Sequence, residues 1–375
     1  QITFQGEQGS IIDRNLGGGN VLRNIEFYGG SYITIDGLEL TDSDTVPPSP
    51  DLATTCKSPH DRGRNGIKIN ENTGGALAHH IVIKNMSIHG LRGQGILGAA
   101  DYMQVLNNHI YDNGGKSKGW AHQGYGTYLM GKYMLIRGNH IHGNNGNGIR
   151  TGPGSTDLKK NLTDSIIENN LVYDNGGHFV HTGDGTECNL LNQGDGILIW
   201  HGSGNIIRNN IVYGNVSYGI RVNEDVAVNN KPNLVSNNTV YKNGVNSAGH
   251  QGIYCYDGEK TIVKNNISYL SGKENIFKGC TNQLSNNLTT DPKFVNPAAG
   301  DFGLLEGSPA INKGMELRAE VPDDFMGTKR PVDLLYDIGA FEGAGSKAGV
   351  LPGVGAGLPA GIGGGGGTGS GLGNC

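Results

Sequence analysis

The sequence lacks the features that define several common fold classes. Over most of the 375 residues no apolar period of 3.6 residues indicates an amphipathic helix. No apolar run approaches the length needed to span a bilayer. Serine-hydrolase, Walker and dinucleotide-binding signatures are absent. A net charge of −5 argues against a nucleic-acid or anionic-membrane partner. What remains is strand and turn chemistry.

An Asn-Asn phrase recurs along the chain. Its clearest copy is Asn209-Asn210-Ile211-Val212-Tyr213, and four further copies end at Tyr111, Tyr173, Tyr241 and Tyr269. The second Asn, counting weaker copies, falls at positions 108, 139, 170, 210, 238, 266 and 287, so the steps run from 21 to 40 residues. A short unit with variable insertions is typical of a solenoid.

The second half of each unit is a Gly-Ile pair or a near equivalent, within short β-branched runs bounded by Gly, Asn and Asp. The shortest steps allow about three short strands per coil. The sequence therefore predicts an all-β fold, a single-stranded right-handed parallel β-helix. Stacked coils bring like residues about 4.8 Å apart. Asn side chains should then hydrogen-bond along the stack, and the Tyr column, with His89 and His142 at matching places, should stack likewise.

We expect residues 1–290 to form the β-helix, 291–342 a C-terminal cap segment and 343–375 a Gly-rich tail. The cap segment carries Asp301-Phe302-Gly303-Leu304, Gly307-Ser308-Pro309-Ala310-Ile311 and Asp337-Ile338-Gly339-Ala340-Phe341-Glu342. It resembles the closing segment of secreted bacterial β-helix proteins, which carry variable surface anchors after it and resemble pectate- and alginate-lyase-type β-helices. This resemblance implies a secreted protein, extracellular or on the cell surface.

A strip of basic and aromatic residues is expected along one outer face. The residue after each aligned isoleucine should point outward, and this column reads Lys68, Leu97, Tyr128, Arg150, Leu198, Arg221, Tyr254 and Phe277. Three insertions, 42–65, 113–123 and 175–193, leave one corner beside it, where loops commonly form a working surface. Cations for carboxylates and ring faces for sugars suit an acidic polysaccharide.

Candidate residues for lyase or epimerase chemistry follow from this strip. A β-helix lyase needs a base, and Lys68, Arg150 and Arg221 are the candidates, with His122, Tyr125 or Tyr128 as proton donors. Trp120, Tyr125 and Tyr254 are candidates for sugar binding. Calcium is the candidate cofactor, with oxygen ligands from Asp184, Glu187, Asp195, Glu224 and Asp225. A second metal hypothesis uses His178 and His181. These residues form no spaced motif, and cationic side chains on outward strands commonly serve solubility alone.

Five cysteines do not pair evenly. Cys255 and Cys280 follow aligned isoleucines of neighbouring coils by two and four residues, so they can pair if the register shifts. Cys56 and Cys188 lie in insertions at the same corner and are the second candidate pair. Free buried thiols are the alternative for each. Cys375 is left over, as a candidate for cross-linking or anchoring.

Both ends suggest self-association. No amphipathic helix precedes the first strand, so we expect that either a cap was removed in processing, as the start at Gln1 suggests, or another chain supplies it. The tail from Gly343 resembles a flexible linker, yet its alternating small and apolar residues can add a strand to a sheet edge. If one subunit's tail met the next subunit's first coil, the contact would propagate into a filament.

Three functional hypotheses follow from the sequence. The favoured one is a structural surface protein that self-associates into a homopolymer. The alternative is a secreted lyase or epimerase acting on an acidic polysaccharide. The third is a carbohydrate-binding protein without catalysis.

Overall fold

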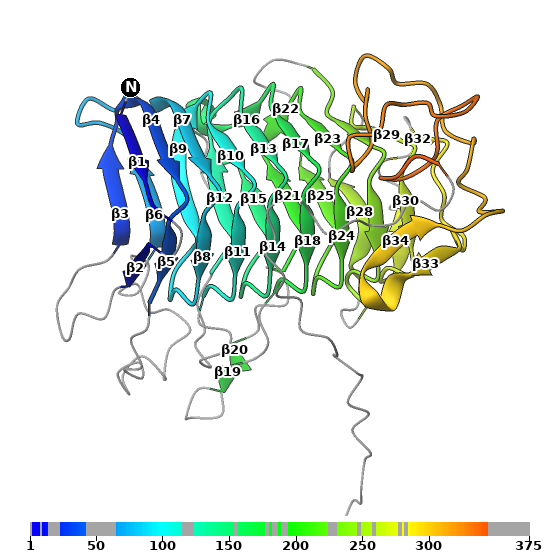
Figure 1. The fold of residues 1–375 in the computed structure, drawn as a ribbon, viewed down its shortest axis with the longest axis horizontal. Helices are drawn as coiled ribbons and strands as arrows, with labels where there is room; N and C mark the ends of the chain where they lie inside the picture. Colours follow the sequence, from blue (N-terminus) through cyan, green and yellow to red (C-terminus); the bar gives the residue numbers. More distant parts are fainter. Residues whose placement is uncertain are drawn as a thin grey trace, which may run out of the picture.

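The computed structural model is a right-handed parallel β-helix (Figure 1). The structure describes residues 2–7, 10–13, 23–42, 65–114, 124–153, 157–176, 180–181, 187–188, 194–223, 231–245, 249–256, 260–276, 280 and 284–343. No helix within these ranges is long and apolar enough to cross a membrane.

Each coil contributes one strand to each of three parallel sheets, as the length of the repeat predicts. The first sheet contains β1 (Ile2–Gln5), β4 (Ser31–Asp36), β7 (Ala78–Lys84), β10 (Gln104–Leu106), β13 (Leu135–Arg137), β17 (Ile166–Glu168), β23 (Ile206–Arg208), β26 (Leu234–Ser236), β29 (Ile262–Lys264) and β32 (Leu284–Ser285). The second sheet contains β2 (Ile11–Asp13), β5 (Glu39–Thr41), β8 (Ser87–His89), β11 (His109–Tyr111), β14 (His140–His142), β18 (Leu171–Tyr173), β24 (Ile211–Tyr213), β27 (Thr239–Tyr241) and β30 (Ile267–Tyr269). The third sheet contains β3 (Arg23–Tyr28), β6 (Asn65–Asn70), β9 (Ile96–Asp101), β12 (Thr127–Met130), β15 (Ile149–Thr151), β21 (Ile197–Trp200), β25 (Ile220–Asn223), β28 (Gln251–Tyr256) and β31 (Glu274–Ile276).

Short elements accompany the three sheets. A pairing between β7 and β9 joins the first sheet to the third. The remaining elements are β16 (Leu162–Thr163), β22 (Gly202–Ser203), β19 (Val180–His181), β20 (Glu187–Cys188), β33 (Phe294–Asn296), β34 (Asp301–Leu304) and the 3₁₀ turns η3 (Leu158–Lys160) and η5 (Pro297–Ala299).

The core consists of apolar columns that run along the helix axis. In the second sheet the central residue of each strand points inward, and these residues are fully buried: Leu40, Ile88, Ile110, Ile141, Val172, Val212 and Val240. Strand residues alternate between the two faces of a sheet. The flanking residues of the same strands therefore point outward, which leaves columns of side chains on the outer surface.

The predicted Asn ladder is confirmed. The side chain of Asn170 donates to Asn210 Oδ1 at 2.9 Å and to the Ile136 carbonyl at 2.9 Å, and its own oxygen accepts from the Asn139 side chain at 2.9 Å. The same pattern links Asn108 through Asn287. A second ladder, Asn113, Asn144, Asn175, Asn215 and Asn243, lies at the next corner and was not predicted.

The predicted aromatic stack is confirmed only over part of its length. Ring centroids lie 4.6 Å apart for His89 and Tyr111, 4.8 Å for His142 and Tyr173, and 4.7 Å for Tyr173 and Tyr213. Beyond this point Phe302 packs against Tyr213 and Tyr241, with centroids 5.0 and 5.5 Å away. The expectation of one continuous stack to Tyr269 is therefore wrong, because the C-terminal segment packs onto the column.

Residues 291–342 pack along the side of the last coils. Phe294, Phe302 and Phe341 form one apolar cluster with Ile211 and Ile267 on the outer face of the second sheet. Figure 1 shows this segment, coloured yellow to orange, beside the C-terminal coils. The sequence assigned it a capping role, and in the structure it covers an outer face.

Cys255 and Cys280 form a disulfide with an S–S distance of 2.13 Å, as one of the two hypotheses for this pair predicted. Cys56 and Cys375 lie outside the described residues, as does the side chain of Cys188. The tail hypothesis concerns residues that lie outside the description too. At the other end, β1 pairs with β4 and with no other described strand.

Candidate functional site

The outward strip on the third sheet is confirmed by the strand register. Lys68 pairs with Leu97, Leu97 with Tyr128, and Tyr128 with Arg150. The column continues through Leu198 and Arg221 to Tyr254. Leu198 is 2% exposed, so it lies beneath the surface although it belongs to the column. Phe277 lies outside the described residues.

Two arginines of this column lie among aromatic rings. The Arg150 guanidinium carbon is 4.8 Å from the centroid of the Tyr128 ring and 5.2 Å from that of Tyr125. The Arg221 guanidinium carbon is 5.1 Å from the Tyr218 centroid. Such contacts stabilise a cation and restrict its orientation.

Trp200 connects the two arginines. Its ring centroid is 5.8 Å from the guanidinium of Arg150 and 5.4 Å from that of Arg221. Because Leu198 separates the two arginines in the register, their strands are two coils, or about 10 Å, apart. Tyr254 completes the surface, with its centroid 5.8 Å from the Arg221 guanidinium.

A buried carboxylate lies below this pair. Asp195 is fully buried, and its Oδ2 is 4.0 Å from a terminal nitrogen of Arg221. Its Oδ1 accepts from the Tyr218 backbone N–H at 3.2 Å. Burial raises the pKa of Asp195 to about 6, although Arg221, the Tyr218 hydrogen bond and Arg150 each act to lower it.

Asp195 replaces an amide at this corner. Asn147, one coil earlier, and Asn65, four coils earlier, fill the same role, since each side-chain oxygen accepts from a backbone N–H of the next coil. Either an amide or a carboxylate can supply that acceptor. The carboxylate adds a second oxygen, Oδ2, which makes no hydrogen bond within the described part of the chain. The structural role alone therefore does not require Asp at position 195.

The site is cationic and open. Two guanidinium groups outnumber one carboxylate, and the Arg221 side chain keeps 19% exposure. The rings of Tyr128, Trp200, Tyr218 and Tyr254 are partly exposed. The Nε atoms of both arginines are buried without a hydrogen-bond partner among the described residues. The arrangement suits an anionic ligand that also presents flat, weakly polar faces.

Sequence reasoning found part of this cluster. Arg150, Arg221, Tyr125, Tyr128 and Tyr254 lie in or beside it as expected, whereas Lys68 lies three strands away from Arg150 in the register and outside the cluster. Asp195, proposed as a calcium ligand, is fully buried and lies 4.0 Å from Arg221, and its role as a calcium ligand stays a prediction.

Three residues of the cluster were missed as site residues. Trp200 lies on the outward side of β21, two residues after Leu198 of the outward column. Because strand residues alternate between the two faces, the sequence could have identified it. Tyr218 and His250 lie just before β25 and β28, and their ring centroids are 4.6 Å apart. Each of the two precedes a Gly-Ile pair by one or two residues, which is the signal that was available in the sequence.

Several predicted residues lie outside the described residues: Trp120, His122, His178, Asp184, Glu224 and Asp225. His181 and Glu187 belong to the antiparallel pair β19–β20, and their side chains are not described. Calcium and the His178–His181 metal site therefore remain predictions.

Comparison with known proteins identifies the family. Residues 2–192 and 185–289 match the family described as the right-handed β-helix region, and the chain belongs to it. No curated protein matches the chain in sequence. Among solved structures, pectate lyase Pel9A is similar at 18% identity, with 91% of this chain and 87% of that chain covered and a TM-score of 0.56.

Two alginate epimerases show weaker similarity. The periplasmic alginate epimerase AlgG has 11% identity, 67% coverage of this chain, 46% of that chain and a TM-score of 0.40. The A-module of the Azotobacter vinelandii mannuronan C-5 epimerase AlgE4 has 14% identity, 76% and 83% coverage, and a TM-score of 0.37. At these identities the likeness to Pel9A shows the shared fold alone.

Proposed function

We propose that this protein is an extracellular polysaccharide lyase or epimerase that acts on a uronate-containing polymer at the Arg150–Arg221 site. The observation that carries the proposal is the pair of arginines, two coils apart and surrounded by Tyr and Trp rings. The fold shared with a pectate lyase supports the same class of substrate. No observation within the described residues favours self-association to the same degree.

The arginines would bind the carboxylates of the polymer. A guanidinium presents a planar set of donors that matches a carboxylate. The rings of Trp200 and the tyrosines would contact the apolar faces of the sugars. Asp195 would hold Arg221 in place from below, as a positioning residue.

The chemistry begins at the hydrogen on C5, which is α to the carboxylate. A cation that neutralises the carboxylate, here one arginine of the pair, stabilises the negative charge that develops when a base takes this proton. The second arginine, in its neutral form, is our candidate for that base. In a lyase the C4–O bond then breaks, a C4=C5 double bond forms and the leaving oxygen takes a proton. In an epimerase a proton returns to C5 from the opposite face. Tyr128, beside Arg150, is our candidate for the proton donor.

The test compares arginine variants with a matched control. Arg150→Ala and Arg221→Ala should each lower kcat/KM on pectate or alginate by about 100-fold or more, as loss of a charge-stabilising donor does. Lys68→Ala removes a cation from the same column outside the cluster and should retain activity. Unsaturated products measure the lyase reaction, and exchange of the C5 hydrogen in deuterated water measures the epimerase reaction. Both are run with and without calcium.

The outcomes separate the hypotheses. Saturable binding of acidic polysaccharide that is lost in the arginine variants, without product or exchange, would establish a carbohydrate-binding protein instead of an enzyme. Neither binding nor turnover on any acidic polysaccharide would contradict the proposal. Equal loss in Lys68→Ala would show that net charge, and not this cluster, controls activity.

A further inference from the structure

Three histidines gather on the outer face of the second sheet, away from the arginine site on the third. His109 lies on β11, and His140 and His142 lie on β14 of the next coil. In the parallel register His109 is opposite His140. The buried Ile141 separates the two β14 histidines, so both imidazoles project from the same face.

The ring nitrogens converge. The Nε2 atoms of His109 and His142 are 2.9 Å apart, and one ring nitrogen from each of the three histidines lies within 4.8 Å of the others. A tetrahedral metal with bonds of 2.0–2.1 Å places its nitrogen ligands about 3.3 Å apart. The separations in the cluster, from 2.9 Å to at most 4.8 Å, bracket this spacing, so the rings must rotate to reach one ion.

The surroundings suit a bound ion more than a solvated histidine surface. His140 is buried, and its Nδ1 makes no hydrogen bond within the described residues. The Tyr173 hydroxyl lies 3.0 Å from His140 Nε2. Tyr111 and Tyr173 stack on either side of the His142 ring, with centroids 5.3 and 4.8 Å away, and so limit its movement.

Burial favours the neutral form of two of the three rings, which is the form that coordinates metal. Burial, with His89 as a lesser cause, lowers the pKa of His109 to about 4, and burial lowers that of His140 to about 3. Among the described residues this is the one group of three His, Cys, Asp or Glu side chains close enough together to hold a metal ion.

We propose that His109, His140 and His142 form a binding site for a divalent transition-metal ion, with Zn²⁺ as the expected occupant. Three imidazoles leave a fourth tetrahedral position for water or for the Tyr173 hydroxyl. Imidazole nitrogens suit zinc, copper and nickel, whereas calcium prefers oxygen ligands. The site is therefore distinct from the calcium site expected for the lyase reaction.

Binding of Co²⁺, a spectroscopic substitute for Zn²⁺, tests the proposal. The full chain, produced without a histidine tag and treated with a chelator, is titrated with Co²⁺ and followed by visible absorption. We expect about one ion per chain and the intense bands of a four-coordinate site, displaced by added Zn²⁺. His109→Gln and His142→Gln should weaken binding at least tenfold, since each removes one of three ligands.

Two controls keep the test specific. His89→Gln removes a histidine of the same stacked column that pairs with Glu39 instead of the cluster, at 2.8 Å, and should bind Co²⁺ as the unaltered chain does. Arg150→Ala, at the arginine site, should also leave Co²⁺ binding unchanged, so failure of the proposed enzyme activity is distinguishable from failure of the metal site. Folding of each variant is checked by thermal unfolding.

Two results would overturn the proposal. One is Co²⁺ binding by the unaltered chain that is no tighter than binding by His109→Gln. The other is Co²⁺ bands equal in the unaltered chain and in both ligand variants. Either result would show that the three histidines form only a hydrogen-bonded and stacked column.

Discussion

Asp195 illustrates how one atom changes the role of a repeat position. Its Oδ1 accepts a hydrogen bond from a backbone N–H of the next coil, as the Asn147 side-chain oxygen does one coil earlier. Its Oδ2 lies 4.0 Å from Arg221. A buried carboxylate is costly because the charged form is removed from water. A carboxylate at this position therefore lowers the stability of the fold and places a fixed charge beside the arginine pair, which is typical of functional sites.

Asp195→Asn tests this effect through the pH dependence of stability. The pKa of Asp195 is raised from 3.8 to about 6, so the folded chain binds more protons than the unfolded chain between these values. Stability attributable to this group is therefore greatest at low pH and falls as the pH rises through the window. From about pH 4 to about pH 7 the unaltered protein should lose on the order of 2 kcal/mol relative to the Asn variant.

Urea unfolding of both proteins across this pH range provides the measurement. The Asn side chain keeps the acceptor for the Tyr218 N–H, so the comparison isolates the carboxylate. Parallel pH profiles for the two proteins would show that folding does not raise the pKa of Asp195.

At the scale of elements, the two residues of each Asn-Asn pair have different structural roles, one in the turn and one in the ladder. The first Asn adopts a left-handed backbone, with φ of 53° at Asn169 and 52° at Asn209, which Asn tolerates better than most residues. The second Asn turns inward and joins the ladder. The phrase recurs because both roles recur at the same corner of every coil.

The outward Asn residues also hold the C-terminal segment. Asn169 donates to the Phe325 carbonyl at 3.0 Å, Asn209 to that of Asp323 at 2.7 Å, and Asn265 to that of Met315 at 2.8 Å. Asn237 and Asn286 make equivalent contacts with Asp337 and Lys313. A turn residue of the helix thus becomes a docking contact.

Asn170→Ala tests the ladder. The substitution removes two donated bonds and the oxygen that accepts from the buried Asn139 backbone N–H and side chain, of which the side chain keeps the Val105 carbonyl as an acceptor. Each buried polar group left unpaired costs about 1–3 kcal/mol, so we expect unfolding to become easier by about 3 kcal/mol or more. Denaturant unfolding measures the loss.

The matched control for the ladder is Asn72→Ala. The Asn72 oxygen accepts from Gly74 and Ala76 in an exposed turn, where water can replace both bonds. Its loss should cost less than about 1 kcal/mol. Similar losses at positions 72 and 170 would show that burial of the ladder contributes little.

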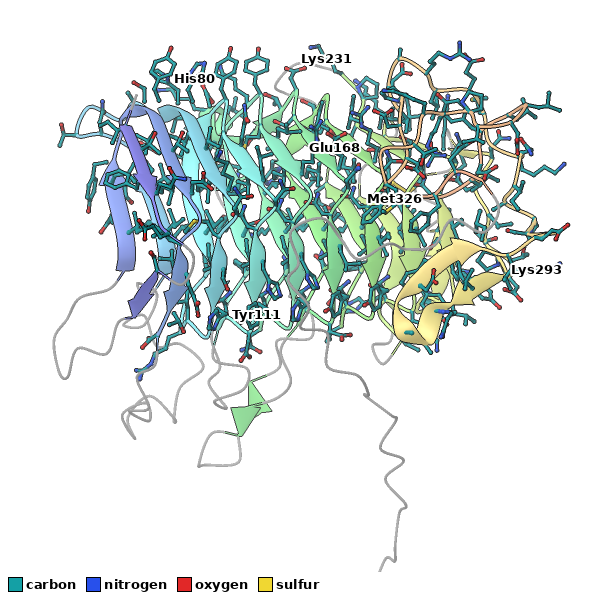
Figure 2. The ribbon with its side chains drawn as sticks, viewed as in Figure 1. His80, Tyr111, Glu168, Lys231, Lys293 and Met326 are labelled. Atoms are coloured by element: carbon teal, nitrogen blue, oxygen red, sulfur yellow. A yellow bond between two sulfur atoms is a disulfide. The ribbon has the colours of Figure 1, made fainter. Side chains whose placement is uncertain are left out.

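At the scale of the whole molecule, stacked coils create long surfaces from short repeats. The arginine site and the histidine cluster lie on different sheets, so one solenoid presents two chemically distinct faces. In Figure 2, Tyr111 of the histidine column and His80 of the first sheet lie at opposite edges of the helix. Each face can change by substitution without altering the inward columns.

Self-association is tested on the whole molecule. Negative-stain microscopy compares the full chain with a version that ends at Gly343. If the protein acts as an enzyme on soluble polymer, both versions should be monodisperse, with equal activity per chain. Filaments from the full chain that vanish on truncation would instead support the structural hypothesis, with the tail as the joint.

The sequence alone determined the fold and most of the strip. A parallel β-helix repeats one coil, so identical corners demand identical residues, and the Asn and Gly-Ile spacing records the register directly. Alternation within a strand then shows which residues point outward, as at Tyr128, Arg150 and Arg221. The residue pattern in the sequence and the coils of the fold repeat with the same spacing, so the fold can be predicted from the pattern.

Only the tertiary structure decided which side chains meet. Trp200 between the two arginines, Asp195 beneath Arg221 and the three converging histidines depend on distances across coils and on side-chain rotamers. The side on which the C-terminal segment packs, and hence where the aromatic stack ends, depends on shape complementarity between distant segments. Such contacts have no period in the sequence, because they join residues that the repeat does not relate.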